Sequence, residues 1–188
     1  MKVTVYASSS DAVDRRYLDA ARGFAGRLAA RGDELIYGGT AVGVMGALAE
    51  AMRVAGGRVT GVLPQLMADR GLADRACDEL VLTPDMPARK QELMARADAF
   101  VALPGGFGTL EELLEVLTLK QLGYHGKPIV LLDLEGFYQP LLAVFERFFA
   151  EGFAKRDYAA LYRVAADVDA VVAALDQPDD AELPTKWF

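Results

Sequence analysis

Hydrophobic and polar positions follow two patterns that alternate along the chain. Short, nearly continuous apolar runs are typical of strands buried in a parallel sheet, and apolar residues spaced three and four apart are typical of helices. The strand-like runs are residues 2–7, 34–37, 59–63, 79–82, 99–103 and 129–132. The helix-like stretches are residues 14–30, 44–54, 89–95, 109–122 and 137–149, and a last short strand and helix fall within residues 162–175.

Strands that alternate with helices predict a parallel sheet covered by helices on both faces. We therefore expect an α/β fold, a Rossmann-like doubly wound parallel sheet, in a single domain over residues 1–175. In such a sheet, ligands bind at the carboxyl ends of the strands. Residues 65–75 are polar and are expected to form a loop or a broken helix. Residues 176–188, with two prolines and several acids, are expected to form a polar, poorly ordered tail.

Composition and charge narrow the choice of partners. The chain has 188 residues, is 53% hydrophobic and carries a net charge of −7, which argues against binding to nucleic acid or to an anionic membrane. A single cysteine excludes an internal disulfide, and a single histidine argues against a zinc site, so no metal is expected. Because no signal peptide or bilayer-spanning run is recognisable, a cytoplasmic location is expected.

Residues 104–112 (PGGFGTLEE) carry the strongest chemical signal, because they connect a strand-like run to a helical pattern. Three glycines at such a turn let backbone N–H groups converge, and the helix N-terminus adds a partial positive charge, which together favour a phosphate. Glu112 places a carboxylate about one helical turn further on. In the alternative interpretation, Thr109 and Glu112 form a capping box that closes the helix N-terminus.

A second glycine turn occupies residues 37–46 (YGGTAVGVMG). Its spacing is neither that of a dinucleotide-binding G-x-G-x-x-G turn nor that of a P-loop, so its glycines serve either a ligand or only the turn and its packing. The adjacent Arg89 and Lys90 follow residues 84–88 at a predicted helix start. They either hold a phosphate or carboxylate or form an ordinary solvated face. Ser9, after the first strand, offers a hydroxyl to a ligand.

These pieces together match one family. Residues 104–112 fit the pattern P-G-G-x-G-T-x-x-E, residues 86–90 (MPARK) fit M-x-x-R-K, and residues 37–46 fit the accompanying glycine turn. The chain resembles the LOG (Lonely Guy) family of cytokinin riboside 5′-monophosphate phosphoribohydrolases, from the first strand to about residue 152. The resemblance implies a Rossmann-like, usually dimeric protein that hydrolyses AMP or an N6-modified AMP to the free base and ribose 5-phosphate. Similar sequences are often labelled possible lysine decarboxylases, but no lysine motif for pyridoxal phosphate is recognisable here.

The resemblance also implies roles for individual residues. The catalytic pair falls on Arg89 and Glu112, and no cofactor is implied. The substrate-binding positions are Ser9, Gly38, Gly39, Gly43, Met45, Lys90, Gly105, Gly106, Phe107, Gly108, Thr109, Leu110, Glu111 and Thr118. This chain departs from the family pattern at Thr40, at Pro87 and Ala88, and in residues 65–75. That last segment lacks the usual glutamate, for which Asp69 or Asp74 is the candidate replacement.

Cleavage of a ribosyl C–N bond builds positive charge on the sugar. Glu112, held ionised by the helix dipole, suits stabilisation of that cation or activation of water, while Arg89 either positions Glu112 or assists the departing base. Residues 105–109 are expected to bind the 5′-phosphate. The alternative is a non-catalytic nucleotide or pterin-cofactor carrier, or a nucleotide sensor, which needs the glycine turns but not the Arg89–Glu112 pair.

The predicted helix 109–122 carries a wide apolar arc, as a helix covered on two sides does. The residues of this arc are Leu110, Leu113, Leu114, Val116, Leu117 and Leu119. We therefore expect a homodimer formed through this helix, with the nucleotide sites near the interface.

Overall fold

The computed structural model describes residues 1–178 and contains a seven-stranded, all-parallel sheet. The strands are β1 (Lys2–Tyr6), β2 (Glu34–Tyr37), β3 (Val59–Pro64), β4 (Glu79–Thr83), β5 (Ala99–Ala102), β6 (Ile129–Leu132) and β7 (Arg163–Ala165). Their order across the sheet is β4-β3-β2-β1-β5-β6-β7. The predicted doubly wound α/β fold is confirmed. The predicted tail of residues 176–188 falls almost entirely outside the described residues.

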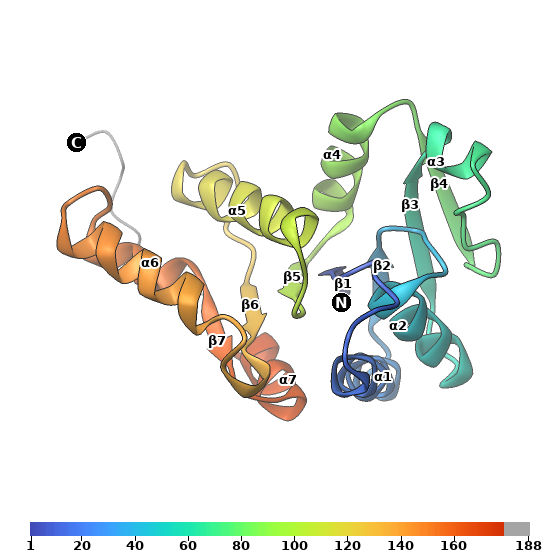
Figure 1. The fold of residues 1–188 in the computed structure, drawn as a ribbon, viewed down its shortest axis with the longest axis horizontal. Helices are drawn as coiled ribbons and strands as arrows, with labels where there is room; N and C mark the ends of the chain where they lie inside the picture. The colour runs from blue at the N-terminus through green and yellow to red at the C-terminus, as the bar shows by residue number, and fades with distance from the viewer. Residues whose placement is uncertain (179–188) are drawn as a thin grey trace.

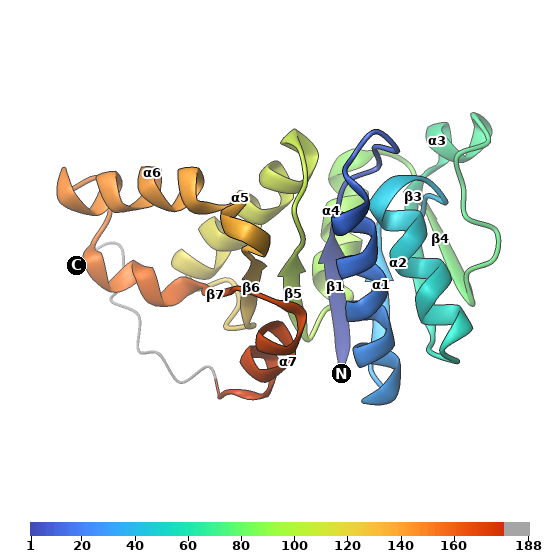
Figure 2. The same cartoon turned by 60° about the horizontal axis from the view of Figure 1, so that its bottom comes forward.

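Helices cover both faces of the sheet (Figures 1 and 2). They are α1 (Arg15–Ala30), α2 (Gly43–Val54), α3 (Gln65–Asp69), α4 (Met86–Arg96), α5 (Phe107–Gln121), α6 (Gln139–Ala150) and α7 (Val168–Asp176), with 3-10 turns at Leu134–Gly136 and Arg156–Leu161. Helices α1, α2 and α7 pack on one face, and α4, α5 and α6 on the other. Neighbouring strand residues such as Phe100 and Val101 enter opposite core clusters, as the pleat requires.

The chain order of the strands reverses between β1 and β5. From β1 the chain winds outward through β2 and β3 to β4, and it then returns to the other side of β1 as β5. At such a switch point the two connections after the strands diverge and leave a crevice at the carboxyl edge. Here those connections contain Ser9, after β1, and the glycines of residues 105–108, after β5.

The helix starts differ most from expectation. Helix α4 begins at Met86 because the Asp85 side chain caps it by accepting from the amide of Ala88 at 2.8 Å. Helix α5 begins at Phe107, with Gly106 as its N-cap residue, and within residues 1–178 no side chain caps it. The capping box of Thr109 and Glu112 is therefore wrong, because Thr109 already lies inside the first turn of α5.

Candidate active site

A cavity of about 310 Å³ lies at the carboxyl edge of the sheet, where β1 and β5 end. Its wall combines the connection after β1, the first glycine turn, helix α3, the start of α4 and the second glycine turn. The lining residues are Ala7, Ser8, Ser9, Gly38, Thr40, Met45, Met67, Met86, Arg89, Gly106, Phe107, Gly108, Thr109, Glu111 and Glu112. Both glycine turns and the predicted catalytic pair thus meet at one cavity.

Arg89 and Glu112 form a buried ion pair in the wall of this cavity. The Nη1 atom of Arg89 donates to Oε1 of Glu112 at 2.6 Å, and its Nε donates to the carbonyl oxygen of Val62 at 3.0 Å. A side chain of this kind, fixed at two points, has lost most of its freedom to swing away. The guanidinium is therefore held on β3 and presented to Glu112.

Burial raises the pKa of Glu112 above its ordinary value of 4.5, and the charge and hydrogen bond of Arg89 oppose that rise without cancelling it. The direction is opposite to the one that the helix dipole alone predicts. Desolvation in the cavity wall therefore outweighs the helix N-terminus. A carboxylate of this kind is more basic than an exposed one, which is the property that proton abstraction from water requires.

The second glycine turn contains two kinds of glycine. A Cβ atom on Gly105 would lie 2.1 Å from Oγ1 of Thr109, so Gly105 permits the turn to close on α5. Around Gly106 and Gly108, by contrast, the described residues leave the space within 4 Å of such an atom empty. These two glycines stand at the N-terminus of α5 and line the cavity. They leave room for an anion to reach the backbone N–H groups of the helix.

In the first glycine turn, protein atoms already occupy the positions that side chains on Gly38, Gly39 and Gly43 would take. A Cβ atom on Gly38 would lie 2.4 Å from Nη2 of Arg89, and one on Gly43 would lie 2.5 Å from the carbonyl carbon of Ser9. A Cβ atom on Gly39, at φ +76°, would likewise lie 3.1 Å from the backbone nitrogen of Val62. Only glycine combines these approaches with the positive φ angles of Gly39 and Gly43.

The structure brings most of the predicted site residues to the cavity. Those that line it are Ser9, Gly38, Met45, Arg89, Gly106, Phe107, Gly108, Thr109, Glu111 and Glu112. Gly39, Gly43 and Gly105 support the turns from behind, and Lys90 pairs at the rim with Glu111 at 2.5 Å and Glu115 at 3.2 Å.

Two of the predicted residues point elsewhere. Leu110 packs against the core, and Thr118 lies further along α5, where its hydroxyl donates to the carbonyl oxygen of Leu114 at 2.7 Å. Thr118 lines a separate groove between α5 and α6.

Several lining residues were not predicted to bind substrate. Met67 on α3 is the main one, and its only signal in the sequence was an apolar side chain within the polar stretch 65–75. The two candidate replacements for the family glutamate have other partners. Asp69 accepts a hydrogen bond from Gln65 at 2.7 Å, and the buried Asp74 accepts from Tyr37 and Arg53.

Two kinds of feature are absent from the described residues. Among residues 1–178, no group of three or more His, Cys, Asp or Glu side chains is arranged to hold a metal ion. In the same part of the chain, no helix is both long enough and apolar enough to cross a membrane.

A doubly wound sheet, an open glycine turn at a helix N-terminus and a buried carboxylate–guanidinium pair define a nucleotide-binding α/β protein of the Rossmann-like class. The family described as "Possible lysine decarboxylase" matches residues 45–175 of this chain. A probable cytokinin riboside 5′-monophosphate phosphoribohydrolase of Oryza sativa subsp. japonica is 42% identical over 156 residues, which are 83% of this chain and 70% of that protein. A cytokinin riboside 5′-monophosphate phosphoribohydrolase of Arabidopsis thaliana is 38% identical over 175 residues, 93% of this chain and 77% of that protein. The chain belongs to this family, the LOG family, as its motifs predicted.

Solved structures also resemble this chain. The molybdenum cofactor carrier protein of Chlamydomonas reinhardtii superimposes with a TM-score of 0.73 at 28% identity, over 94% of this chain and 96% of the carrier. A molybdenum cofactor binding protein of Rippkaea orientalis gives 0.71 at 22% identity, over 92% and 93% of the two chains, and shows the shared fold alone.

Proposed function

We propose that this protein hydrolyses the N-glycosidic bond of AMP or an N6-modified AMP, releasing the free base and ribose 5-phosphate. The observation that carries this proposal is the buried 2.6 Å pair of Arg89 and Glu112, which shares one cavity with an open glycine turn. The named reaction of the Oryza and Arabidopsis relatives supports the same chemistry. Because nucleoside monophosphates are intracellular, the proposed location is the cytoplasm.

Substrate positioning begins at the second glycine turn. The 5′-phosphate binds the N–H groups at the start of α5, where Gly106 and Gly108 leave room for it. That anchor fixes the ribose against Glu112, which follows in the second turn of the same helix. Correct positioning of this kind lowers an activation barrier by several kcal/mol, on the order of 7 or more in the best cases.

Glu112 then acts on the sugar. As the C–N bond breaks, the ribose approaches an oxocarbenium ion, and an adjacent carboxylate stabilises that charge or takes a proton from the attacking water. The raised pKa of Glu112, caused mainly by burial, favours the second role because it makes the carboxylate a stronger base. Arg89 holds the carboxylate in place at 2.6 Å. The scheme uses only the substrate, water and these side chains.

The experiment that tests this proposal is incubation of the purified protein with AMP and, separately, with N6-isopentenyl AMP. Chromatography follows the free base, and the Glu112→Gln variant is the control. Release of base that disappears in the variant supports a phosphoribohydrolase, and the ratio of the two rates identifies the preferred base. Binding of either nucleotide without release of base contradicts the proposal.

The second candidate function is a carrier or sensor, favoured by the structural likeness to the molybdenum cofactor carrier protein. A carrier needs the open glycine turn but makes no use of a buried carboxylate that accepts a proton from water. It predicts that Glu112→Gln leaves ligand affinity unchanged and that the unmodified protein returns bound nucleotide intact.

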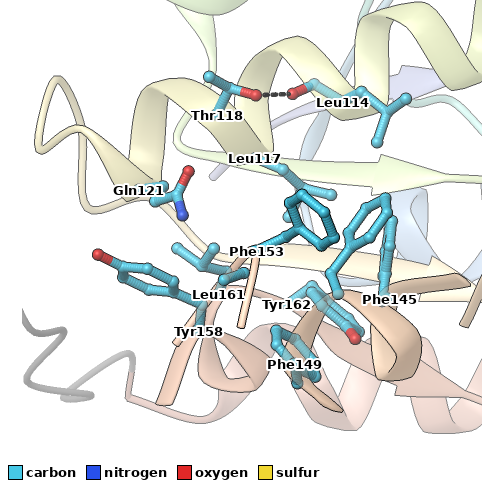
Figure 3. Close-up of a pocket in the computed structure, with 12 residues that line it drawn as sticks. Leu114, Leu117, Thr118, Gln121, Phe145, Phe149, Phe153, Tyr158, Leu161 and Tyr162 are labelled. Carbon is cyan, nitrogen blue, oxygen red and sulfur yellow. Dashed lines mark hydrogen bonds between the residues drawn. The ribbon is translucent and has the colours of Figure 1, made fainter. Parts of the chain in front are cut away.

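We also propose a homodimer through α5. An apolar groove of about 380 Å³ runs between α5, α6 and the Arg156–Leu161 turn, and Figure 3 shows Leu117, Phe145 and Phe153 around it. The Phe153 side chain is 80% exposed in the single chain, and a second copy would cover it. Thr118, which the family pattern assigns to nucleotide binding, lines this groove. A dimer through this face would bring Thr118 towards the second copy.

The dimer is tested by the mass of the protein in solution at micromolar concentration. Phe153→Ser is expected to weaken the dimer by removing an exposed apolar contact, at little cost to the fold of each copy. Val54→Ser is the matched control, because Val54 is 84% exposed on α2, away from the groove. A monomeric mass for the unmodified protein, or equal effects of both variants, contradicts an interface at this groove.

A further inference from the structure

A buried polar cluster lies behind the first glycine turn and takes no part in the mechanism above. The hydroxyl of Tyr37, the last residue of β2, donates to Oδ2 of Asp74 at 2.7 Å. Nη1 of Arg53, on α2, donates to the same oxygen at 2.7 Å. Sγ of Cys77 lies 3.4 Å from the Tyr37 hydroxyl. A carboxylate buried with two strong donors of this kind holds its neighbours in fixed positions.

The cluster clamps the loop after α3 to the first glycine turn. The amide of Asp74 donates to the carbonyl oxygen of Gly39 at 2.9 Å, and Thr40 forms an isolated bridge with Ala73. The other carboxylate oxygen of Asp74 accepts from the amide of Ala76 at 3.0 Å, which keeps the loop closed. Both the backbone and the side chain of Asp74 therefore bind the segment that contains Gly38 and Gly39.

That segment forms one wall against Arg89. The Nη2 atom of Arg89 lies so close to Gly38 that even a methyl group there would come within 2.4 Å of it. The other restraints on this guanidinium are its hydrogen bonds to Val62 and Glu112. Because packed protein has few voids, a shift of the turn is transmitted to the side chain that rests on it.

We propose that Asp74 is a positioning residue for catalysis, which acts through Tyr37 and the first glycine turn to hold Arg89 against Glu112. This inference rests on the proposed function for its kinetic consequences. It assigns Asp74 a different role from the one expected from the family pattern. Asp74 does not replace a glutamate that faces the substrate, because its side chain is turned away from the cavity towards Tyr37 and Arg53.

The protonation state of the cluster stays constant over the range in which the reaction is assayed. Burial raises the pKa of Asp74, but the hydrogen bonds from Tyr37, Arg53 and Ala76 outweigh it and lower the pKa overall. Burial, Cys77 and Asp74 raise the pKa of Tyr37 well above that of a free tyrosine. Asp74 is therefore a carboxylate and Tyr37 a neutral donor at neutral pH. A change in the pH profile of a cluster variant then reports on Glu112.

The titratable groups that face Glu112 come from two helices and one strand. Arg89 and Lys90 on α4 lower the pKa of Glu112, and Glu111 on α5 raises it, while Tyr6 on β1 is a neutral neighbour whose own pKa is raised by burial and by Glu112. Of these groups, Arg89 is the one that the first glycine turn touches. If the turn moves, Arg89 lowers the pKa of Glu112 less effectively, and that pKa rises further.

The chain offers a closely matched control for Asp74. Asp33 precedes β2 at the opposite edge of the sheet, and Asp74 contacts the last residue of the same strand. The Asp33 side chain is 5% exposed and pairs with Nε of Arg31 at 2.7 Å, and that of Asp74 is 4% exposed and pairs with Arg53 at 2.7 Å. Removing either carboxylate breaks a similar buried pair, but only one of the two lies behind the catalytic arginine.

The test compares Asp74→Ala with Asp33→Ala in kcat, in KM and in the pH dependence of kcat/KM. Asp74→Ala is expected to lower kcat by about tenfold or more, the scale of a small misplacement of a catalytic group. It is expected to change KM by less than about threefold and to raise the pH of the acidic limb by about half a unit or more. Asp33→Ala is expected to change none of the three. A loss of kcat without a shift of the acidic limb, or equal effects of both variants, would overturn the inference.

A second measurement separates this inference from the proposed function. Carbon-13 NMR titration gives the pKa of the Glu112 carboxyl directly, with its resonance identified by its loss in Glu112→Gln. Asp74→Ala is expected to raise that pKa and Asp33→Ala to leave it unchanged, whether or not the protein turns over AMP. If Asp74→Ala does not fold, Tyr37→Phe removes only the hydroxyl and is expected to shift the pKa in the same direction. An unchanged Glu112 pKa in the folded variants would overturn the positioning role.

Discussion

The two glycine turns of this protein occupy equivalent places in the fold and have opposite surroundings. Each follows a strand and leads into a helix at the carboxyl edge of the sheet, the first after β2 and the second after β5. Gly38 in the first turn is in close contact with Arg89, whereas Gly106 in the second has open space within 4 Å among the described residues. Glycine therefore serves two purposes in this site. In the first turn it lets the protein close on itself, and in the second it leaves room for a ligand.

The largest effect is expected where the second turn ends. Glu112→Gln keeps the shape of the side chain and removes its charge, so activity should fall by about 10²-fold or more, the scale of a positioned general base. The fold should lose little stability, because burial already disfavours the charged form of Glu112. Release of free base and thermal unfolding measure the two quantities. Near-wild-type activity would reduce Glu112 to a structural partner of Arg89.

Gly38→Ala should have the next largest effect, because it fills the closed turn. Its methyl group would meet Nη2 of Arg89 at 2.4 Å and Sδ of Met45 at 2.7 Å. Overpacking of this kind costs about 1–3 kcal/mol of stability. Displacement of the guanidinium should lower kcat by about 10- to 100-fold. Steady-state kinetics measures the change in kcat, and denaturant unfolding measures the change in stability. A stable variant with full kcat would show that contact with Gly38 does not position Arg89.

Gly106→Ala should instead affect binding alone. The added methyl group enters the space left for the ligand and meets no described protein atom within 4 Å. We expect an unchanged unfolding free energy and a KM for AMP raised by about tenfold, which corresponds to about 1.4 kcal/mol. Gly26→Ala is the matched control, because Gly26 on α1 is equally open and lies far from the cavity. If both variants bind AMP equally well, the phosphate does not lie at the second turn.

The smallest effect is a displaced pH profile in the unmodified protein. Burial raises the pKa of Glu112 above 4.5, so kcat/KM should fall as the pH drops through that raised value. The effect on stability has the opposite sign, because the folded state binds this proton more tightly than the unfolded chain does. The stability contribution of Glu112 is therefore present at low pH and lost as the pH rises through its folded pKa. Acid inactivation that coincides with acid unfolding would contradict this assignment.

The sequence predicted the sheet better than it predicted where helices begin. The strand-like runs at residues 34–37 and 129–132 have the same bounds as β2 and β6, because a strand buried on both faces is apolar at nearly every position, and in β2 only the half-buried Glu34 departs from this. Helix starts depend on backbone geometry that apolar spacing does not show. Helix α5 starts two residues before the predicted position because Phe107 and Gly108, which continue no apolar period, already belong to its first turn.

The site was predictable where its residues lie within short motifs. Arg89 and Glu112 each belong to a local pattern, and the fold brings the two patterns together. Met67 and Asp74 belong to no such pattern; Met67 lies on the short helix α3 and Asp74 in the loop that follows it. The partners of Asp74 lie 37 and 21 residues away in sequence, at Tyr37 and Arg53. Pairings between residues that lie far apart in sequence form only in the packed fold, and the periodicity of the sequence does not predict them.

A bound ligand would complete the hydrogen bonding at the N-terminus of α5. Within residues 1–178 no side chain caps this helix, and its N-cap position is the glycine Gly106. A bound phosphate would supply the missing acceptor and so take the place of a capping residue. The amide protons of the first turn then become natural reporters of occupancy, exchanging with solvent in the free protein and becoming protected when ribose 5-phosphate is added. A helix that is completed only by its ligand couples local order to the presence of substrate.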